Sequence, residues 1–389
     1  MTMKTNIDNI MKEYKAIRVM ISGGGTGGHI FPAVSIANKL MEVNPRTEIL
    51  FVGAEGKMEM EKVPAAGYRI VGLPIVGLQR RLTVKNIIND ISVPFKLLYS
   101  IHKAGKVIDA FKPDIVVGVG GYASAPLLWK ASTKKIPTLI QEQNGFAGLT
   151  NKLLAKKVGS ICVAYDGMER FFPAGKIVKS GNPIRSDIVP ATAQMVSQGI
   201  EFYKLNPHRK HILIVGGSLG SRTLNQSMER WIERGCPGGQ DVEILWQCGK
   251  YYKKNIDRYM EEGPGKAYRD SIHHTDFIAR MDLAYAVADV VVSRSGASSI
   301  SELCAAHKAC IFVPSPNVAE DHQTHNAMAL VNKDAALLVK DADAPASLME
   351  KAVELAADKE KTSLLEKNIA ALALTDAAQT IVDEIYKLV

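Results

Sequence analysis

The chain has 389 residues, more than a single hydrophobic core usually supports, so two domains are expected. With 47% hydrophobic and 23% charged residues the composition is that of a globular protein, which excludes a disordered or fibrous chain. The net charge of +8 predicts an anionic partner: a nucleotide, a nucleic acid or a membrane surface.

The termini and the cysteines narrow the cellular setting. The N-terminus is charged and has no apolar signal-peptide core, and the uncharged stretch 115–129 is too short and glycine-rich to span a bilayer. A cytoplasmic protein is therefore expected. The cysteines lack CxxC spacing and are expected to be reduced core residues: Cys162, Cys236, Cys248, Cys304 and Cys310.

Short apolar runs alternate with helix-length amphipathic segments along the whole chain, which predicts βαβ units and parallel sheets. The two halves repeat one arrangement of loops. Strand-like runs end in GGGTGG and GVGGYAS in the first half, and in GGSLGSR and SRSG in the second. Ligands of open α/β sheets bind beyond the carboxyl ends of the strands. We therefore predict an α/β protein with two doubly wound Rossmann-like domains facing an interdomain cleft.

The boundary between the halves is expected at the turn-forming Gly181-Asn182-Pro183. From there a mobile polar connection should run to about Arg209. The C-terminal stretch ends in an amphipathic segment, Thr375 to Leu388, that predicts a helix.

The first glycine loop, 23–29, has five glycines in six positions and ends on the imidazole of His29. Glycines permit close backbone approach to a ligand, and the amides that open the next helix can receive an anion. At that helix N-terminus a neutral His29 can act as a general base or contact substrate. The alternative is that His29 only hydrogen-bonds the loop. No acidic residue ends the second strand and no P-loop motif is present.

The segment from Ser293 to Glu302 is a second candidate anion site, because it follows a buried-type strand and leads into a helix. Glu302 can accept two hydrogen bonds from a diol. Ser299 and Glu302 also match a capping box, so helix capping stays open as the alternative. The DxD-like stretch at 341–343 reads as a charged turn.

Two segments of the first half, 75–82 and 93–103, mix apolar side chains with cations. Such segments can enter the headgroup layer while their cations meet anionic lipids. A helix packed on its own core has the same pattern, so both readings stay open.

Taken in order, the loops closely resemble the MurG family, the peptidoglycan N-acetylglucosaminyltransferases that convert lipid I to lipid II on a GT-B fold. The matching segments, spanning roughly Arg18 to Leu330, are GGGTGGHIFPAVSIA, VGVGGYASAP, QEQNGFAGLTNKLLA, GNPIR, GGSLGSR, SRSGASSISE and DHQTHNA. The chain departs from the family at Leu219 and Ser221, where Gln and Ala are common, and in a slightly longer loop before Gln323.

The resemblance implies an N-terminal domain over 1–182, on the acceptor and membrane side, completed by the C-terminal helix 370–389. Residues 183–369 would form the domain that binds the UDP-sugar donor. The implied reaction is inverting transfer of N-acetylglucosamine from UDP-N-acetylglucosamine to the 4-hydroxyl of N-acetylmuramic acid in undecaprenyl-diphosphate-linked muramyl pentapeptide. No metal or other cofactor is implied.

Site residues follow from the same resemblance. In the first domain Thr26, Gly27 and Gly28 would border the donor sugar and pyrophosphate, Asn144 would reach the donor from the opposite side, and His29 would be the catalytic base.

In the second domain Arg185 and Ser218 would contact the diphosphate, and Ile278 would lie beside the uracil. Gln323 would hold the sugar hydroxyls. Glu302 would contact the ribose. The nucleotide would bind at the start of one helix through Ala297, Ser298, Ser299, Ile300, Ser301 and Glu302.

The implied partners are UDP-N-acetylglucosamine, the lipid-linked muramyl pentapeptide and an anionic membrane surface, with other cell-wall synthesis proteins as candidates and no nucleic acid. Because the acceptor stays in the bilayer, the stretch 75–103 becomes the leading docking surface of a peripheral protein on the cytoplasmic face of the bacterial membrane. Alternatives are a UDP-N-acetylglucosamine 2-epimerase, another GT-B glycolipid glycosyltransferase, a nicotinamide-dependent dehydrogenase and a non-catalytic membrane-binding module.

Overall fold

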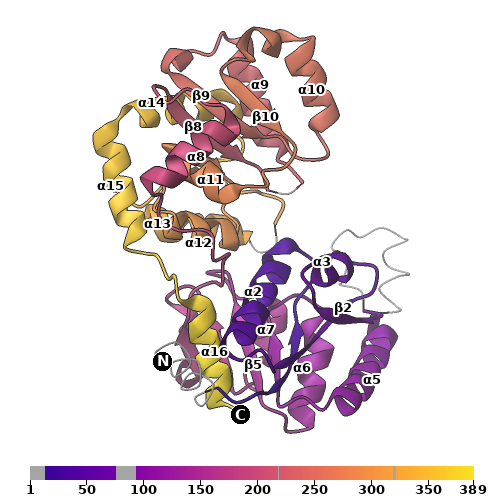
Figure 1. Ribbon diagram of the computed structural model, residues 1–389. Coiled ribbons are helices and arrows are strands. Elements are labelled where there is room, and N and C mark those ends of the chain that lie inside the picture. Colours follow the sequence, from indigo (N-terminus) through magenta and orange to yellow (C-terminus); the bar gives the residue numbers. More distant parts are fainter. Residues whose placement is uncertain (1–13, 76–92, 218, 319–320) are drawn as a thin grey trace, which may run out of the picture. The chain divides into compact units, whose positions relative to one another are not determined.

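A computed structural model describes residues 14–75, 93–217, 219–318 and 321–389 (Figure 1). The chain forms two compact units. The first contains the described residues up to Ile184 together with Thr375–Val389, and the second is Arg185–Leu374. Each unit is built on one parallel sheet.

The sheet of the first unit has the strand order β3-β2-β1-β4-β5-β6-β7. Its strands are β1 (Arg18–Ser22), β2 (Glu48–Ala54), β3 (Arg69–Leu73), β4 (Ile115–Gly118), β5 (Thr138–Glu142), β6 (Ser160–Val163) and β7 (Ile177–Lys179). Its helices are α2 (Gly27–Val43), α3 (Glu59–Ala65), α5 (Val93–Phe111), α6 (Ser124–Thr133), α7 (Leu149–Leu154) and α16 (Ala377–Lys387), with the 3-10 turns η1 (Met168–Arg170) and η2 (Ala174–Lys176). The central strands β4, β5 and β6 are buried along their whole length, as expected when both faces of a parallel sheet are covered.

The C-terminal helix α16 packs against α2 in the first unit (Figure 1). Its apolar face is buried there, with Ile381, Val382 and Ile385 fully inaccessible. Tyr14 also reaches this helix, since its hydroxyl donates a 2.6 Å hydrogen bond to Oδ1 of Asp383. The compact units therefore divide at 184/185 and 374/375, compared with 182/183 and 369/370 expected from the sequence.

The sheet of the second unit has the order β10-β9-β8-β11-β12-β13. Its strands are β8 (Lys210–Val215), β9 (Val242–Gln247), β10 (Ile272–Thr275), β11 (Val290–Ser293), β12 (Cys310–Phe312) and β13 (Leu337–Leu338). Its helices are α8 (Ala193–Tyr203), α9 (Arg222–Glu233), α10 (Lys253–Glu261), α11 (Met281–Val287), α12 (Ala297–Ala305), α13 (His322–Val331), α14 (Ala344–Ala357) and α15 (Lys359–Ala370), with η3 (Gly239–Asp241) and η4 (Pro264–Tyr268). The strand order reverses between β8 and β11, as it does between β1 and β4 in the first unit, and such switch points are where ligands bind.

Helix α8 lies within the segment expected to be a mobile polar connection, so that expectation is wrong for residues 193–203. The hydroxyl of Thr192 caps the helix by accepting a 3.2 Å hydrogen bond from the Met195 amide. Gly199 lets α8 approach α11 closely, because a Cβ at this position would lie 2.5 Å from Cγ1 of Val287. The helix is therefore stabilised by packing against α11, a contact that the sequence alone does not reveal.

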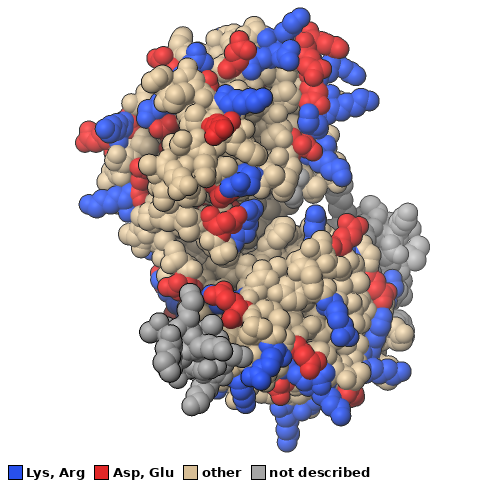
Figure 2. All heavy atoms as spheres, viewed as in Figure 1, with Lys and Arg blue, Asp and Glu red and all other residues tan. Residues whose placement is uncertain are grey.

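The cysteines are core residues, as expected from the sequence, and many charged side chains lie on the surface. All five cysteines are buried and unbridged. Figure 2 shows lysines and arginines spread over both units and mixed with acidic side chains on the face in view. Among the described helices, none is both long and apolar enough to cross a membrane.

Candidate active site

The glycine loops lie at the carboxyl ends of the strands that flank the two switch points. The loop after β1 leads into α2 and the loop after β4 leads into α6. In the second unit the loops after β8 and β11 lead into α9 and α12. The strands predicted before all four loops are therefore confirmed, as are the helices predicted after the first loop and the SRSG segment.

The glycine loop after β1 is held in place by Glu59, a residue that sequence reasoning did not find. This carboxylate is fully buried and accepts 3.0 Å hydrogen bonds from the amides of Gly25 and Ala54. A Cβ at Gly24 would collide with it, so a glycine is needed there. Because the Gly25 amide already has a carboxylate partner, it is not free to bind phosphate.

His29 lies in the first turn of α2, after the N-cap residue Thr26 and the helical Gly27 and Gly28. Its Nδ1 is 3.1 Å from the carbonyl oxygen of Gly24 and 3.1 Å from the Thr26 hydroxyl. A carbonyl oxygen can only accept, so the contact with Gly24 places the proton on Nδ1. In the neutral imidazole the lone pair is then on Nε2.

The second loop of the first unit meets the same imidazole. Gly120, after β4, has a left-handed backbone with a φ of 89°, and a Cβ there would lie 3.0 Å from Nε2 of His29. A glycine at this position leaves room for the ring. The structure thus brings the GVGGYAS and GGGTGGH motifs together around His29.

Asn144 is oriented by the buried carboxylate of Glu142 at the end of β5. Oε1 of Glu142 accepts hydrogen bonds from the backbone amide of Asn144 at 3.1 Å and from its side-chain amide at 3.3 Å. Oε2 accepts from the Gly148 amide at 3.0 Å and from Nδ2 of Asn151 at 2.9 Å. Four donors on one carboxylate fix this loop in place.

The rest of the QEQN motif connects to the GNPIR motif inside the first unit. Asn182 donates a 3.0 Å hydrogen bond to the carbonyl of Gln143 and accepts one of 3.0 Å from Nε2 of Gln141. These three side chains are buried. These residues of the QEQN and GNPIR motifs therefore form a polar network that supports the Asn144 loop.

In the second unit the GGSLGSR loop is held by Gln247 of β9. Its Oε1 accepts from the Gly216 amide at 3.0 Å, and its Nε2 donates to the carbonyl of Gly217 at 2.7 Å. Ser221 caps α9 by accepting a 3.3 Å hydrogen bond from the Leu224 amide. Ser218 lies outside the described residues, so its contact with the diphosphate stays a prediction.

Helix α12 corrects one interpretation of the SRSG segment. The helix begins at Ala297 with Gly296 as its N-cap, so Ser299 and Glu302 both lie inside it and the capping-box alternative is wrong. The side chains of Ala297 and Ile300 are buried, so any contact that these two residues make with the nucleotide would come from their backbone amides.

The hydroxyls of α12 differ in how they are used. Ser301 donates a 3.0 Å hydrogen bond to the carbonyl of Ala297. The buried hydroxyl of Ser298 has no hydrogen-bond partner within the described ranges. A buried hydroxyl without a partner is unfavourable, which makes Ser298 a candidate ligand contact.

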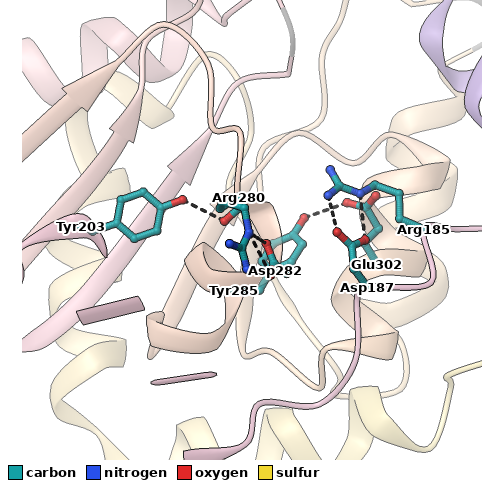
Figure 3. A network of polar contacts seen from close by, with 7 residues as sticks. All are labelled: Arg185, Asp187, Tyr203, Arg280, Asp282, Tyr285 and Glu302. Carbon is teal, nitrogen blue, oxygen red and sulfur yellow. Dashed lines mark hydrogen bonds and ion pairs between the residues drawn. The ribbon is translucent and has the colours of Figure 1, made fainter. Parts of the chain in front are cut away.

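Glu302 is held by Tyr285 of α11, whose hydroxyl donates a 3.1 Å hydrogen bond to Oε2 (Figure 3). Tyr285 is only 4% exposed. Burial raises the pKa of Glu302 to about 7, while the hydrogen bond from Tyr285 and the charge of Arg185 act in the opposite direction. Glu302 therefore changes between acid and carboxylate near neutral pH. Sequence reasoning did not find Tyr285.

Arg185 forms a bidentate ion pair with Asp187 (Figure 3). Sequence reasoning did not find Asp187. Nε is 2.9 Å from Oδ1 and Nη2 is 2.5 Å from Oδ2.

Ile278, the residue expected beside the uracil, lies in the loop after β10. Its side chain is only 4% exposed, whereas that of its neighbour Phe277 is 59% exposed.

Gln323 connects two loops of the second unit. Its Oε1 accepts a 2.8 Å hydrogen bond from the Ser315 amide, and its carbonyl accepts one of 2.8 Å from the Ser295 hydroxyl. Its Nε2 is the remaining side-chain group for a sugar hydroxyl. Asp341 of the DxD-like stretch pairs with Nη1 of Arg294 at 2.5 Å, so it supports the SRSG loop.

Family models match both units. Residues 19–163 match the glycosyltransferase family 28 N-terminal domain, and residues 211–382 match its C-terminal domain. Relatives from Parabacteroides distasonis and Cytophaga hutchinsonii are each 52% identical over 97% of this chain and 99% of theirs. Both are named UDP-N-acetylglucosamine–N-acetylmuramyl-(pentapeptide) pyrophosphoryl-undecaprenol N-acetylglucosamine transferase.

Solved structures agree. The chain matches the crystal structure of Acinetobacter baumannii MurG with a TM-score of 0.74 and 27% identity, over 95% of this chain and 99% of that one. A putative UDP-N-acetylglucosamine 2-epimerase from Listeria monocytogenes shares the fold alone, with a TM-score of 0.65 and 14% identity over 96% of each chain. The predicted GT-B class, with two Rossmann-like parallel-sheet domains, is confirmed. The chain therefore belongs to glycosyltransferase family 28 and, within it, to the MurG family.

Proposed function

We propose that the protein transfers N-acetylglucosamine from UDP-N-acetylglucosamine to the 4-hydroxyl of N-acetylmuramic acid in undecaprenyl-diphosphate-linked muramyl pentapeptide, which converts lipid I to lipid II. The observation that carries this proposal is the 52% identity, over nearly the whole chain, to relatives named for that activity. The ordered polar networks at the QEQN, GNPIR and SRSG motifs support it. A 2-epimerase is disfavoured because its likeness is restricted to the fold.

The second unit would bind the donor. Glu302 would accept hydrogen bonds from the ribose diol, Ile278 would lie beside the uracil, and Nε2 of Gln323 would donate to a sugar hydroxyl. Arg185, with Ser218, would pair with the diphosphate, a dianion suited to a guanidinium. The buried Ser298 hydroxyl and the first amides of α12 supply further donors for the nucleotide.

The first unit would supply the base and the acceptor side. Nε2 of His29 would take the proton from the 4-hydroxyl as its oxygen forms a bond to C1 of the donor sugar. The bond from C1 to the β-phosphate oxygen breaks on the opposite face, its electron pair leaves with UDP, and the α-linked sugar becomes β-linked. Arg185 would stabilise the charge that grows on UDP.

The amides of Gly27 and Gly28 open α2, where they have no intrahelical acceptor, and the Thr26 hydroxyl is beside them. We assign these groups and Asn144 to the donor sugar and its pyrophosphate. The buried Glu59 charge restricts phosphate contacts to the helix start, away from Gly25.

The function is tested by mixing the protein with radiolabelled UDP-N-acetylglucosamine and a soluble lipid I analogue. Label should move to the analogue and UDP should be released in equal amount. Release of UDP without labelled acceptor, or label found only in a modified nucleotide sugar, would reject the proposal.

We further propose peripheral binding at the cytoplasmic face of the membrane, through the stretch 75–103. Residues 76–92 lie outside the described part of the chain, but the start of α5 exposes Leu98 at 66% and Tyr99 at 58%. Exposed apolar side chains of this kind can enter a headgroup layer. Lys103 would contribute less than the cations of 76–92, because it pairs with Glu55 at 2.7 Å.

Cosedimentation with anionic vesicles tests this surface. Leu98→Glu combined with Tyr99→Glu should reduce binding several-fold, whereas Leu364→Glu, at a position 44% exposed in the second unit, should not. Helix α7 exposes Leu149 and Leu153 at 60% and 64%. If only their replacement by Glu reduces binding, the docking surface lies on α7 and the proposal for α5 is wrong.

A further inference from the structure

Asp187 holds one particular edge of the Arg185 guanidinium (Figure 3). A guanidinium can make paired hydrogen bonds along its Nε–Nη2 edge or along its outer Nη1–Nη2 edge. Asp187 takes the first edge. In the described part of the chain Arg185 makes no other hydrogen bond, so its outer edge remains for an anionic ligand.

This ion pair contributes little to stability. The side chains of Arg185 and Asp187 are 45% and 46% exposed, and exposed pairs are worth about 0–1 kcal/mol. The two residues are separated by Ser186 alone, so the pair does not join distant elements. The main effect of the contact is therefore that Asp187 orients the guanidinium of Arg185.

Glu302 faces the same pair. Arg185 lowers the pKa of Glu302 and Asp187 raises it, so both charges act on that carboxyl. The pKa of Arg185 is raised first by its hydrogen bond to Asp187 and then by the negative charges of Asp187, Glu302 and Asp282, while burial acts against them. Without Asp187, Glu302 is the carboxylate with the next largest effect on Arg185.

We infer that Asp187 is a positioning residue for donor binding: it anchors Arg185 away from Glu302 and directs the outer guanidinium edge to the diphosphate. Loss of Asp187 would let Arg185 turn to Glu302. Such a pair would withdraw the cation from the diphosphate and the carboxylate from the ribose at once. This inference rests on the proposed donor site.

The second unit contains a matched control. Arg280 and Asp282 form the same kind of pair two residues apart, with Nε 2.9 Å from Oδ1 and Nη2 2.6 Å from Oδ2. The Tyr203 hydroxyl donates to the carbonyl of Arg280 at 2.8 Å (Figure 3). Asp282 acts on Arg185 through its charge alone, and it is not among the groups that shift the pKa of Glu302. This pair therefore reproduces the geometry without a hydrogen bond to Arg185.

Calorimetric titration with UDP-N-acetylglucosamine and with uridine separates orientation from folding. At a pH above the Glu302 transition, Asp187→Asn should bind UDP-N-acetylglucosamine about tenfold more weakly, the size expected for a charge-assisted contact. At a pH below the transition, where Glu302 is protonated and cannot pair with Arg185, the uridine affinity of Asp187→Asn should be unchanged. Asp187→Glu should recover part of the loss, because its carboxylate can hold the same edge. Asp282→Asn should match the wild type with both ligands.

Three outcomes would overturn the inference. Tighter binding of UDP-N-acetylglucosamine by Asp187→Asn would mean that Asp187 competes with the diphosphate. Unchanged binding above the Glu302 transition would mean that Arg185 needs no anchor, and an equal loss for uridine below the transition would indicate a structural role. Failure of the wild type to bind UDP-N-acetylglucosamine would instead contradict the proposed function itself.

Discussion

Nδ1 of His29 lies 3.1 Å from the carbonyl oxygen of Gly24, and this contact determines which imidazole nitrogen can accept a proton. Since Nδ1 must carry the hydrogen, Nε2 is the basic nitrogen of the neutral ring. The glycine loop therefore does more than approach a ligand, because its own carbonyl sets the tautomer of the candidate base.

Replacing His29 by Ala should lower the rate of sugar transfer about 10²- to 10⁴-fold, the usual contribution of a general base. UDP-N-acetylglucosamine affinity should stay near the wild-type value, since the proton is taken from the acceptor. Single-turnover transfer to a soluble lipid I analogue measures the first quantity and calorimetry the second. His208→Ala, at an exposed histidine of the second unit, is the control, and nearly normal turnover in His29→Ala would refute the role of the base.

Donor binding by the wild type should depend on pH around the Glu302 pKa of about 7. The diphosphate of UDP-N-acetylglucosamine does not titrate there, so its affinity should increase as Glu302 ionises and becomes a stronger acceptor for the ribose diol. Glu302→Gln should bind about tenfold more weakly above this pH and lose the dependence. A wild-type affinity that is flat across this range would contradict the assignment of Glu302 to the ribose.

Tyr285→Phe should move that transition to higher pH. The Tyr285 hydroxyl donates to Oε2 and favours the ionised carboxylate, so its loss raises the pKa of Glu302 further. One charge-assisted hydrogen bond corresponds to a shift of about one pH unit. The measurement is the midpoint of UDP-N-acetylglucosamine affinity against pH, and a midpoint that moves down or not at all would exclude this contact.

The same carboxyl predicts how stability depends on pH. Its folded pKa of about 7 exceeds the unfolded value of about 4.3, so the folded protein retains a proton that the unfolded chain releases. The Glu302 contribution to the free energy of unfolding should therefore decline as pH rises between these values. Glu302→Gln keeps an acceptor for Tyr285 and should be more stable than the wild type by ~1–3 kcal/mol above pH 7, with no gain below pH 4. Urea unfolding at both pH values tests this, and equal stability at high pH would contradict it.

The strands and the glycine loops could be predicted because their signals are local: apolar runs of strand length, then glycines, then an amphipathic segment. Glu59 could not, since its partner Gly25 is 34 residues away and no spacing rule connects a helix-start acid with a distant loop. Tyr285 and Asp187 have the same difficulty, because their roles depend on where Glu302 and Arg185 point. The capping-box interpretation of Ser299 and Glu302 failed because the helix starts before either residue.

Gly24→Ala should destabilise the first unit by ~2–4 kcal/mol, because its methyl group would meet the buried Glu59 carboxylate. Glu59→Asp retracts that carboxylate, so the double variant should be more stable than the sum of the single effects by at least ~1 kcal/mol. Gly175→Ala is the control, since nothing lies within 4 Å of its added methyl. If the changes in the free energy of unfolding measured with urea are strictly additive, the added methyl group does not clash with the Glu59 carboxylate.

The configuration of the product decides whether the protein is an inverting N-acetylglucosaminyltransferase. Wild-type protein, UDP-N-acetylglucosamine and a soluble lipid I analogue are followed by NMR at the anomeric proton of the transferred sugar. We expect a β linkage to O4 of N-acetylmuramic acid and no change in UDP-N-acetylglucosamine when the acceptor is left out. An α-linked product, or formation of UDP-N-acetylmannosamine without acceptor, would contradict it.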